Sequence, residues 1–204
     1  MTPAARIQAA IDILQTLLVS QKPADRYLNE WARANRYAGA KDRHAIFERV
    51  YTVLRRRAEF GWIMGNGEAR SLVLATLRLE DGLALAQAQE IFTGDKYAPG
   101  QLSQAECAAY CRSPSEPAPE WVRGNFPQWL EAALHDSLPD LPDELQALAA
   151  RAPLDLRVNT LKATREAALA ALAEENIAAE ATPHSPVGIR ITGRARITGA
   201  KAFE

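Results

Sequence analysis

The residue types best able to do chemistry in this sequence are basic, and they concentrate between residues 33 and 57. Eight Lys and Arg side chains lie there against two carboxylates, and four aromatic residues are interleaved with them. Such a surface neutralises phosphates and steers nucleic acid towards itself. A solvated helix face with its aromatic rings in the core would show the same pattern, so both interpretations stay open. The residues are Arg33, Arg36, Lys41, Arg43, Arg49, Arg55, Arg56 and Arg57, with Asp42, Glu48, Trp31, Tyr37, Phe47 and Tyr51.

Candidates for metal binding or nucleophilic catalysis are few. His44, His135 and His184 lie in unrelated segments. Cys107 and Cys111 are four residues apart, so on a helix they share one face. They could be half a metal site or a redox pair, but the lack of a second pair favours two small buried side chains. The sequence contains no dinucleotide-binding, phosphate-loop, zinc-protease or nucleophile-elbow motif. We therefore assign no catalytic residue and no metal ligand.

Charge divides the chain into two unlike parts. The net charge is −1, yet residues 1–80 hold 13 basic and 8 acidic side chains, and the remainder holds 11 and 17. This asymmetry favours two modules with different partners. Two cysteines exclude a disulfide scaffold and suit a reducing compartment such as the cytoplasm. The sequence has neither an apolar run long enough for a membrane span nor the pattern of a signal peptide, so we expect no membrane partner.

Helical signals dominate the first half of the chain. Thr2 and Pro3 are typical of a helix start, and Gly39 is typical of a helix stop. A helix is expected over 41–57, and Ser103 and Glu106 form a capping box for a helix that ends near Cys111. Apolar residues recur at helical spacing elsewhere up to residue 112. Residues 1–112 are therefore expected to form an all-α bundle.

The second half begins with a proline-rich linker and ends in a mixed unit. Residues 113–119 contain three prolines, which predicts a stiff connection. Short helices are expected over 127–138 and 142–150. A strand over 154–161, a helix capped by Thr164, and strands over 177–181 and 187–192 then give the order β-α-β-β. We expect three regions, at 1–112, 113–152 and 153–204, in a mainly α protein with a small α+β (RRM/ferredoxin-like) subdomain.

One segment carries a family resemblance. Residues 157–162 read Arg-Val-Asn-Thr-Leu-Lys, which resembles the R-V-N-T-L-K signature of the NOL1/NOP2/Sun family of RNA cytosine-5 methyltransferases. In the bacterial ribosomal RNA members of the Sun/Fmu (RsmB-like) type, the signature follows a P-x-W-L segment, here residues 127–130. The resemblance implies that residues 1–112 form a NusB-like RNA-binding domain and that the full-length protein uses S-adenosylmethionine.

The family's Rossmann-like catalytic domain would begin after the point where this sequence stops. Its glycine loop and cysteine motifs are not in this sequence, and neither Cys107 nor Cys111 stands in a matching motif. We therefore expect residues 1–204 to be the non-catalytic N-terminal part of a longer enzyme, with no cofactor of its own. It would hold 16S ribosomal RNA, rather than DNA, for a methyltransferase domain in cis.

The RNA-binding residues expected on this basis lie in two places. One is the basic cluster, with Arg33, Arg36, Lys41, Arg43, Arg55, Arg56 and Arg57, and the other is the signature, with Arg157, Asn159 and Lys162. Arg157 and Asn159 could instead be buried groups that tie the strand to a neighbouring domain. A free-standing NusB-like module in antitermination or ribosome biogenesis, and an unrelated small enzyme in which His44, Asp42 and Cys107 converge, remain as alternatives.

Overall fold

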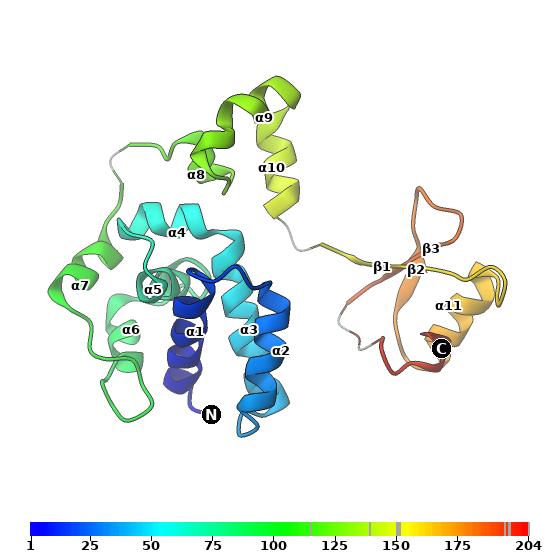
Figure 1. Ribbon diagram of the computed structural model, residues 1–204, viewed down its shortest axis with the longest axis horizontal. Coiled ribbons are helices and arrows are strands. Elements are labelled where there is room, and N and C mark those ends of the chain that lie inside the picture. The colour runs from blue at the N-terminus through cyan, green and yellow to red at the C-terminus, as the bar shows by residue number, and fades with distance from the viewer. Residues whose placement is uncertain (115, 139, 150–151, 194, 196, 204) are drawn as a thin grey trace. The chain divides into compact units, whose positions relative to one another are not determined.

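The computed structural model describes residues 1–114, 116–138, 140–149, 152–193, 195 and 197–203. The chain folds as two compact units, Met1–Ala149 and Ala150–Glu204. The first is helical, and the second contains the sheet (Figure 1). This is the mainly α class with a small α+β part that the sequence predicts. The finer division at residues 112 and 152 stays a prediction.

The helices of the first unit follow one another with short connections. They are α1 (Pro3–Leu17), α2 (Ala24–Ala34), α3 (Ala40–Arg55), α4 (Arg57–Met64), α5 (Ala69–Leu79), α6 (Leu85–Ile91), α7 (Gln104–Cys111), α8 (Glu120–Arg123), the 3-10 helix η1 (Gln128–Leu130), α9 (Glu131–Ser137) and α10 (Leu141–Ala149). The second unit contains β1 (Leu154–Arg157), α11 (Arg165–Glu174), β2 (Ala179–Ala181), β3 (Gly188–Ile191) and η2 (Lys201–Phe203).

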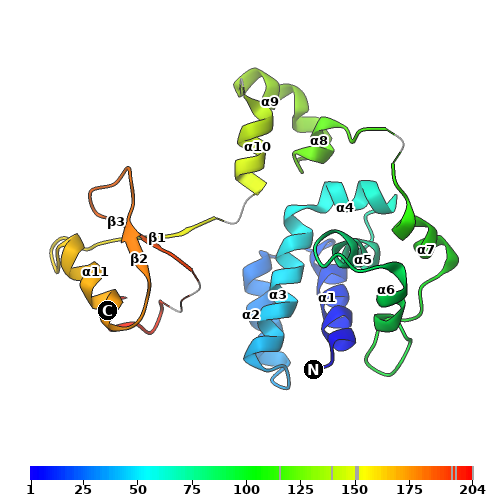
Figure 2. The ribbon, with the colours of Figure 1, turned by 180° about the vertical axis from the view of Figure 1, so that it is seen from behind.

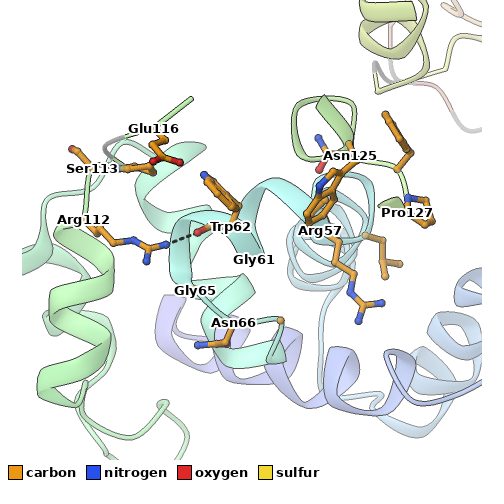
Figure 3. Close-up of a pocket in the computed structure, with 16 residues that line it drawn as sticks. Arg57, Gly61, Trp62, Gly65, Asn66, Arg112, Ser113, Glu116, Asn125 and Pro127 are labelled. Carbon is orange, nitrogen blue, oxygen red and sulfur yellow. Dashed lines mark hydrogen bonds between the residues drawn. The ribbon is translucent and has the colours of Figure 1, made fainter. Parts of the chain in front are cut away.

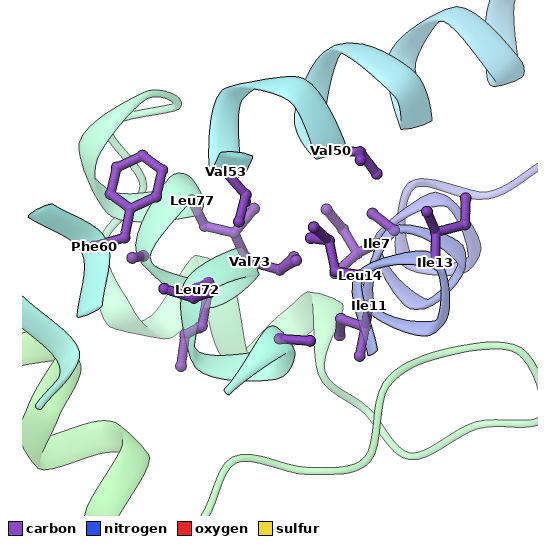
Figure 4. Packing of buried hydrophobic residues seen from close by; sticks show 14 of the residues in the cluster. Ile7, Ile11, Ile13, Leu14, Val50, Val53, Phe60, Leu72, Val73 and Leu77 are labelled. Carbon is purple, nitrogen blue, oxygen red and sulfur yellow. The ribbon is translucent and has the colours of Figure 1, made fainter. Parts of the chain in front are cut away.

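Helix α5 is the centre of the bundle. Its sequence is apolar nearly all round, which is typical of a buried helix, and its residues from Ser71 to Leu77 are all buried. Helices α1, α3 and α4 pack against it, and Figures 1 and 2 show α1, α2 and α3 side by side. Figure 4 shows the resulting core, in which side chains of α1 such as Leu14 meet Val50 of α3 and Val73 of α5. This core fixes the two ends of α3, where the basic residues lie.

Local capping signals correctly predict several helix ends. The Thr2 side chain accepts from Ala5 N at 3.2 Å, with Pro3 in the first turn of α1. Ser103 and Glu106 form the predicted capping box of α7, and Thr164 caps α11. Two predictions were wrong. Gly39 is the N-cap of α3 and not the end of α2, and the helix expected over 41–57 breaks at Arg56, where α3 ends and α4 begins.

A small second core holds the helices that follow the proline-rich segment. Phe126, Leu141 and Leu145 form it, with Trp121 packed against them. The helix expected over 127–138 is divided into η1 and α9, and α10 confirms the one expected over 142–150. Gly124 is required at the centre, because a Cβ there would lie 2.5 Å from Cδ1 of Leu145.

The C-terminal unit has the predicted β-α-β-β order. Its strands are antiparallel in the order β1-β3-β2, with Leu156 opposite Ile189 and Ala181 opposite the same residue on the other side. Leu172 of α11 packs with Ile189, Ile191 and Ile197. Among the described residues, no helix is both long and apolar enough to cross a membrane.

Candidate nucleic-acid interface

The predicted basic cluster contains cations in two different situations. Arg56 donates to both carboxylate oxygens of Glu59 at 2.7 Å, is also ion-paired with Glu80, and lies 4.9 Å from the ring centroid of Phe60. Arg49 likewise pairs with Asp81 at 2.7 Å. These guanidinium groups are compensated by neighbouring carboxylates. Of the two, Arg56 was expected to bind RNA, which stays a prediction, and its contacts place it at the junction of α3 and α4.

Four other cations lie together where α2 ends and α3 begins. Arg33, Arg36 and Lys41 are exposed and Arg43 is half-exposed. None of the four forms an ion pair with any residue that the structure describes. We call this group, together with Tyr37 in the loop between the helices, the α2–α3 corner. Tyr37 is 70% exposed, so its ring is open to solvent between cations on both sides in sequence.

The single acid within residues 31–43, Asp42, does not neutralise the α2–α3 corner. Its carboxylate accepts from the amino group of Met1 at 3.0 Å and from Nε of Arg6 at 2.7 Å. The bond from the Met1 amino group, together with that from Arg6, lowers the pKa of Asp42 below its ordinary value. Asp42 is therefore charged at neutral pH and compensated from α1, and the corner retains its positive charge.

The interleaved aromatic residues divide between the core and the surface. Trp31 and Phe47 meet edge to face with ring centroids 6.0 Å apart and pack against the core. Tyr51 is half-buried there too, and burial raises the pKa of its phenol. Only Tyr37 of the four is exposed. Three of the four rings thus belong to the core, and Tyr37 alone of the four is free to meet a ligand beside the cations of the corner.

Arg55 and Arg57 lie at the opposite end of α3. With a rise of about 1.5 Å per residue, Arg55 lies about 18–21 Å along α3 from Arg43 and Lys41 of the α2–α3 corner. Both are exposed, and Arg57 has no ion pair with a described residue. The cluster that is continuous in sequence therefore forms two separate positive regions in space.

A large open cavity adjoins Arg57. Its volume is about 1100 Å³, and it lies between α4, the segment after α7, and the segment that leads out of α8. Figure 3 shows Trp62 between Arg112 and Glu116 on one side and Asn125 and Pro127 on the other. Asn125 connects the segment after α8 to α4, because its Oδ1 accepts a hydrogen bond from Glu59 N at 3.1 Å. The aromatic lining comes from Trp62, Trp121 and Phe126.

The signature residues Arg157, Asn159 and Lys162 converge in the C-terminal unit. All three are exposed and line one cavity of about 240 Å³ beside α11. Asn159 also builds the loop after β1, since its Oδ1 accepts from Leu161 N at 3.1 Å. Arg157 and Asn159 are therefore not buried by the described residues, and the interpretation that they tie the strand to a neighbouring domain stays open.

The residues weighed for other chemistry are not brought together in these two cavities. Neither cavity is lined by His44, Asp42 or Cys107. Sγ of Cys107 lies 3.7 Å from Nε2 of Gln89, and Cys111 is exposed. The expectation that both cysteines are buried was therefore wrong. No cluster of metal-ligating side chains occurs within the described ranges.

Sequence reasoning missed the cavity residues Trp62, Trp121 and Arg112. They come from three segments that are far apart in sequence, and each segment alone has an ordinary composition. The nearest signal in the sequence is the glycine spacing at 61, 65 and 67, which is typical of a helix end. Gly65 indeed ends α4 with a φ of +76°.

Comparison with known proteins gives two matches. Residues 126–198 match the family model described as the ferredoxin-like domain of Methyltr_RsmF/B-like proteins. The fold resembles the solved crystal structure of PH0851, with a TM-score of 0.57 and 16% identity, over 100% of this chain and 52% of that one. This chain thus spans about half the length of that protein. A search of curated protein sequences found no match.

The family match covers the α8–α10 region from Phe126 onwards and most of the β-α-β-β unit, including the signature at 157–162. It confirms the resemblance indicated by that signature. The ferredoxin-like match agrees with the antiparallel order β1-β3-β2 and the helix that follows β1. Residues 126–198 thus match the ferredoxin-like domain of RsmF/RsmB-like methyltransferases, and the likeness to PH0851 is one of fold.

Proposed function

We propose that this chain is the RNA-binding N-terminal part of an S-adenosylmethionine-dependent 16S ribosomal RNA cytosine-5 methyltransferase of the cytoplasm. It positions the RNA for a catalytic domain in cis, and its bundle serves as the NusB-like RNA-binding domain. The observation that carries the proposal is the α2–α3 corner, where four cations without a described carboxylate partner flank the exposed ring of Tyr37. Cations hold phosphates, and a tyrosine ring stacks on unpaired bases.

The signature surface extends this function to the C-terminal unit. Arg157, Asn159 and Lys162 offer two cations and an amide around one cavity. Contacts of this kind fix the register of an RNA without reading its sequence. The family match at residues 126–198 favours a methyltransferase part over a free-standing module, because it includes this surface.

In this proposal S-adenosylmethionine does not bind to residues 1–204. Its adenosine moiety would fit a glycine loop between a parallel strand and a helix, whereas the strands here are antiparallel. The proposal therefore assigns the cofactor and the methyl transfer to the catalytic domain. The role of residues 1–204 is limited to binding and positioning.

The test is a titration of the full chain with a 16S ribosomal RNA fragment at several salt concentrations. Replacement of Arg33, Arg36, Lys41 and Arg43 by Gln should weaken binding. The slope of log K against log salt concentration should become less steep by about 0.7–0.9 for each phosphate contact that is lost. Tyr37→Ala should weaken binding without changing the salt dependence. Arg49→Gln serves as the control, because the guanidinium of Arg49 is ion-paired with Asp81. Undetectable binding by the unaltered chain, or equal effects of the corner and control variants, would overturn the proposal.

A further inference from the structure

We propose that the cavity between α4 and the α7–α8 connection, which we call the α4–α8 cavity, binds one or two nucleotides of single-stranded RNA. It would be a second RNA contact, distinct from the α2–α3 corner. The inference rests on the proposed function, since it assumes that the chain binds RNA. Apart from Arg55 and Arg57, it concerns residues that the sequence patterns do not single out as a site.

The lining of the α4–α8 cavity is suited to flat apolar rings. Trp62 and Trp121 are half-buried. Phe126 also lines the cavity and is 7% exposed. Nε1 of Trp62 is covered by protein and has no acceptor among the described residues. Trp62 therefore presents ring surface, rather than its N–H, to the cavity. Bases of any sequence stack on such rings.

The charge of the walls favours an anionic ligand that enters from the side of Arg57. Arg57 is exposed and has no ion pair within the described part of the chain. Arg112 adds a second positive charge, although its guanidinium donates to backbone carbonyl oxygens of α4. Glu116 is the one acid of the lining, so phosphates belong at the Arg57 side. A nucleotide has both features, since its base is a flat ring and its phosphate carries a negative charge.

The size and backbone of the cavity agree with this occupant. A volume of about 1100 Å³ exceeds what one nucleotide fills and leaves room for its neighbour. Gly61, Gly65 and Gly67 also line the cavity and contribute only backbone to it. A Cβ at Gly67 would meet nothing within 4 Å, so this side is open. Arg55 and Arg57 together extend the positive surface beyond the cavity mouth.

The openness at Gly67 provides a blocking variant that leaves the fold intact. Gly67 has no left-handed φ, so Gly67→Leu places a side chain at the cavity without backbone strain. Gly100→Leu is the matched control, because its Cβ also meets open space and Gly100 lies outside the cavity lining. Arg57→Gln removes the cation, and Arg123→Gln is its control on α8, since Arg123 lines a different cavity.

The experiment is photo-cross-linking of the full chain to a single-stranded oligouridine that contains 4-thiouridine, with mass-spectrometric mapping and parallel affinity measurement. We expect cross-links in peptides that contain Trp62 or Trp121, in addition to those at Tyr37. Gly67→Leu should abolish the Trp62 and Trp121 cross-links and weaken binding about tenfold, the loss of one stacked base, with the Tyr37 cross-links retained. Arg57→Gln should weaken binding and lower its salt dependence, and both controls should match the unaltered chain.

The failures of the two proposals are distinguishable. RNA binding with cross-links confined to Tyr37, or cavity cross-links that survive Gly67→Leu, would overturn the second RNA contact and leave the proposed function standing. Cavity cross-links with no loss of affinity in Gly67→Leu would also overturn it, because the RNA would then gain nothing from the site. A chain that binds no RNA at all would overturn both.

Discussion

Arg112 caps the end of α4 by donating from Nη2 to the carbonyl oxygen of Ile63 at 2.8 Å, and to that of Trp62 as well. Carbonyl groups in the last turn of a helix have no partner within the helix, and the helix dipole makes them favourable for a cation. Because Arg112 follows α7, this contact ties the start of the proline-rich segment to the α4 wall of the cavity.

Arg112→Ala should therefore lower the free energy of unfolding by about 1–2 kcal/mol, since charge-assisted hydrogen bonds to two carbonyl groups are lost. The free energy of unfolding of Arg112→Lys should lie between those of Arg112→Ala and the unaltered chain, because an ammonium group lacks the planar fork of donors. Chemical denaturation followed by circular dichroism measures the difference, with Arg123→Ala as the control. Equal stability of Arg112→Ala and the control would contradict the capping role.

Glu106 is the acid on which the α7 cap depends. Burial alone would raise its pKa, but hydrogen bonds from Arg70 and Ser103 outweigh that effect and place the pKa below the ordinary 4.5. A pKa lowered by folding means that the charged form is stabilised in the folded state. The stabilisation is fully present above pH 4.5 and is lost as the pH falls through the lower folded-state value.

Glu106→Gln should consequently lower the free energy of unfolding at pH 7 by about 1–3 kcal/mol, through the lost ion pair with Arg70 and a weakened cap. The difference from the unaltered chain should shrink as the pH falls below 4.5, where the native carboxyl also becomes neutral. Thermal melts between pH 3 and pH 7 give this comparison. A stability difference independent of pH would show that the charge of Glu106 is not what stabilises α7.

Gly188 occupies a position in β3 with no room for a side chain. A Cβ there would lie 2.1 Å from Oγ1 of Thr182 and 3.0 Å from Cβ of Ser185. Gly188→Ala should destabilise the C-terminal unit by about 1–3 kcal/mol through overpacking. Hydrogen exchange should then speed up in β3 and α11 while α1 and α5, in the other compact unit, keep their protection.

The combined change Gly188→Ala with Thr182→Ala should recover part of that loss, because the closest atom is removed. Gly199→Ala is the control, since its Cβ would meet nothing within 4 Å. Unchanged exchange in β3 of Gly188→Ala would mean that the turn between β2 and β3 adapts without cost.

Asp155 and Arg190 form a bidentate pair across β1 and β3, at 2.7 and 2.8 Å. The hydrogen bonds from Arg190 lower the pKa of Asp155 below its ordinary 3.8. Asp155→Asn should thus reduce stability of the C-terminal unit at neutral pH, and the difference should vanish as the pH falls well below 3.8. Because the pair is exposed, salt should weaken the effect. A difference that survives 1 M salt would contradict this electrostatic origin.

Features that depend on neighbours in sequence were predictable from the sequence alone. The caps at Thr2, Ser103 and Thr164 use contacts three residues apart, and the β-α-β-β order follows from alternation and turn residues. The signature at 157–162 likewise predicted the match of residues 126–198 to the RsmF/RsmB-like ferredoxin-like domain. Caps and periodic elements can be predicted from the sequence because the interacting residues lie in the same short segment.

Only the tertiary structure decided which basic residues are available to a ligand. The charge of Arg56 is compensated by Glu80, which directly follows α5. The charge of Asp42 is compensated by the amino group of Met1, 41 residues away. The same packing divides one basic run between the two ends of α3 and brings Trp62 and Trp121 into one cavity. These outcomes depend on how α1, α4 and α5 pack around the core, and long-range packing leaves no periodic trace in the sequence. The sequence determines how many charges the chain carries, and the fold determines which of them remain uncompensated.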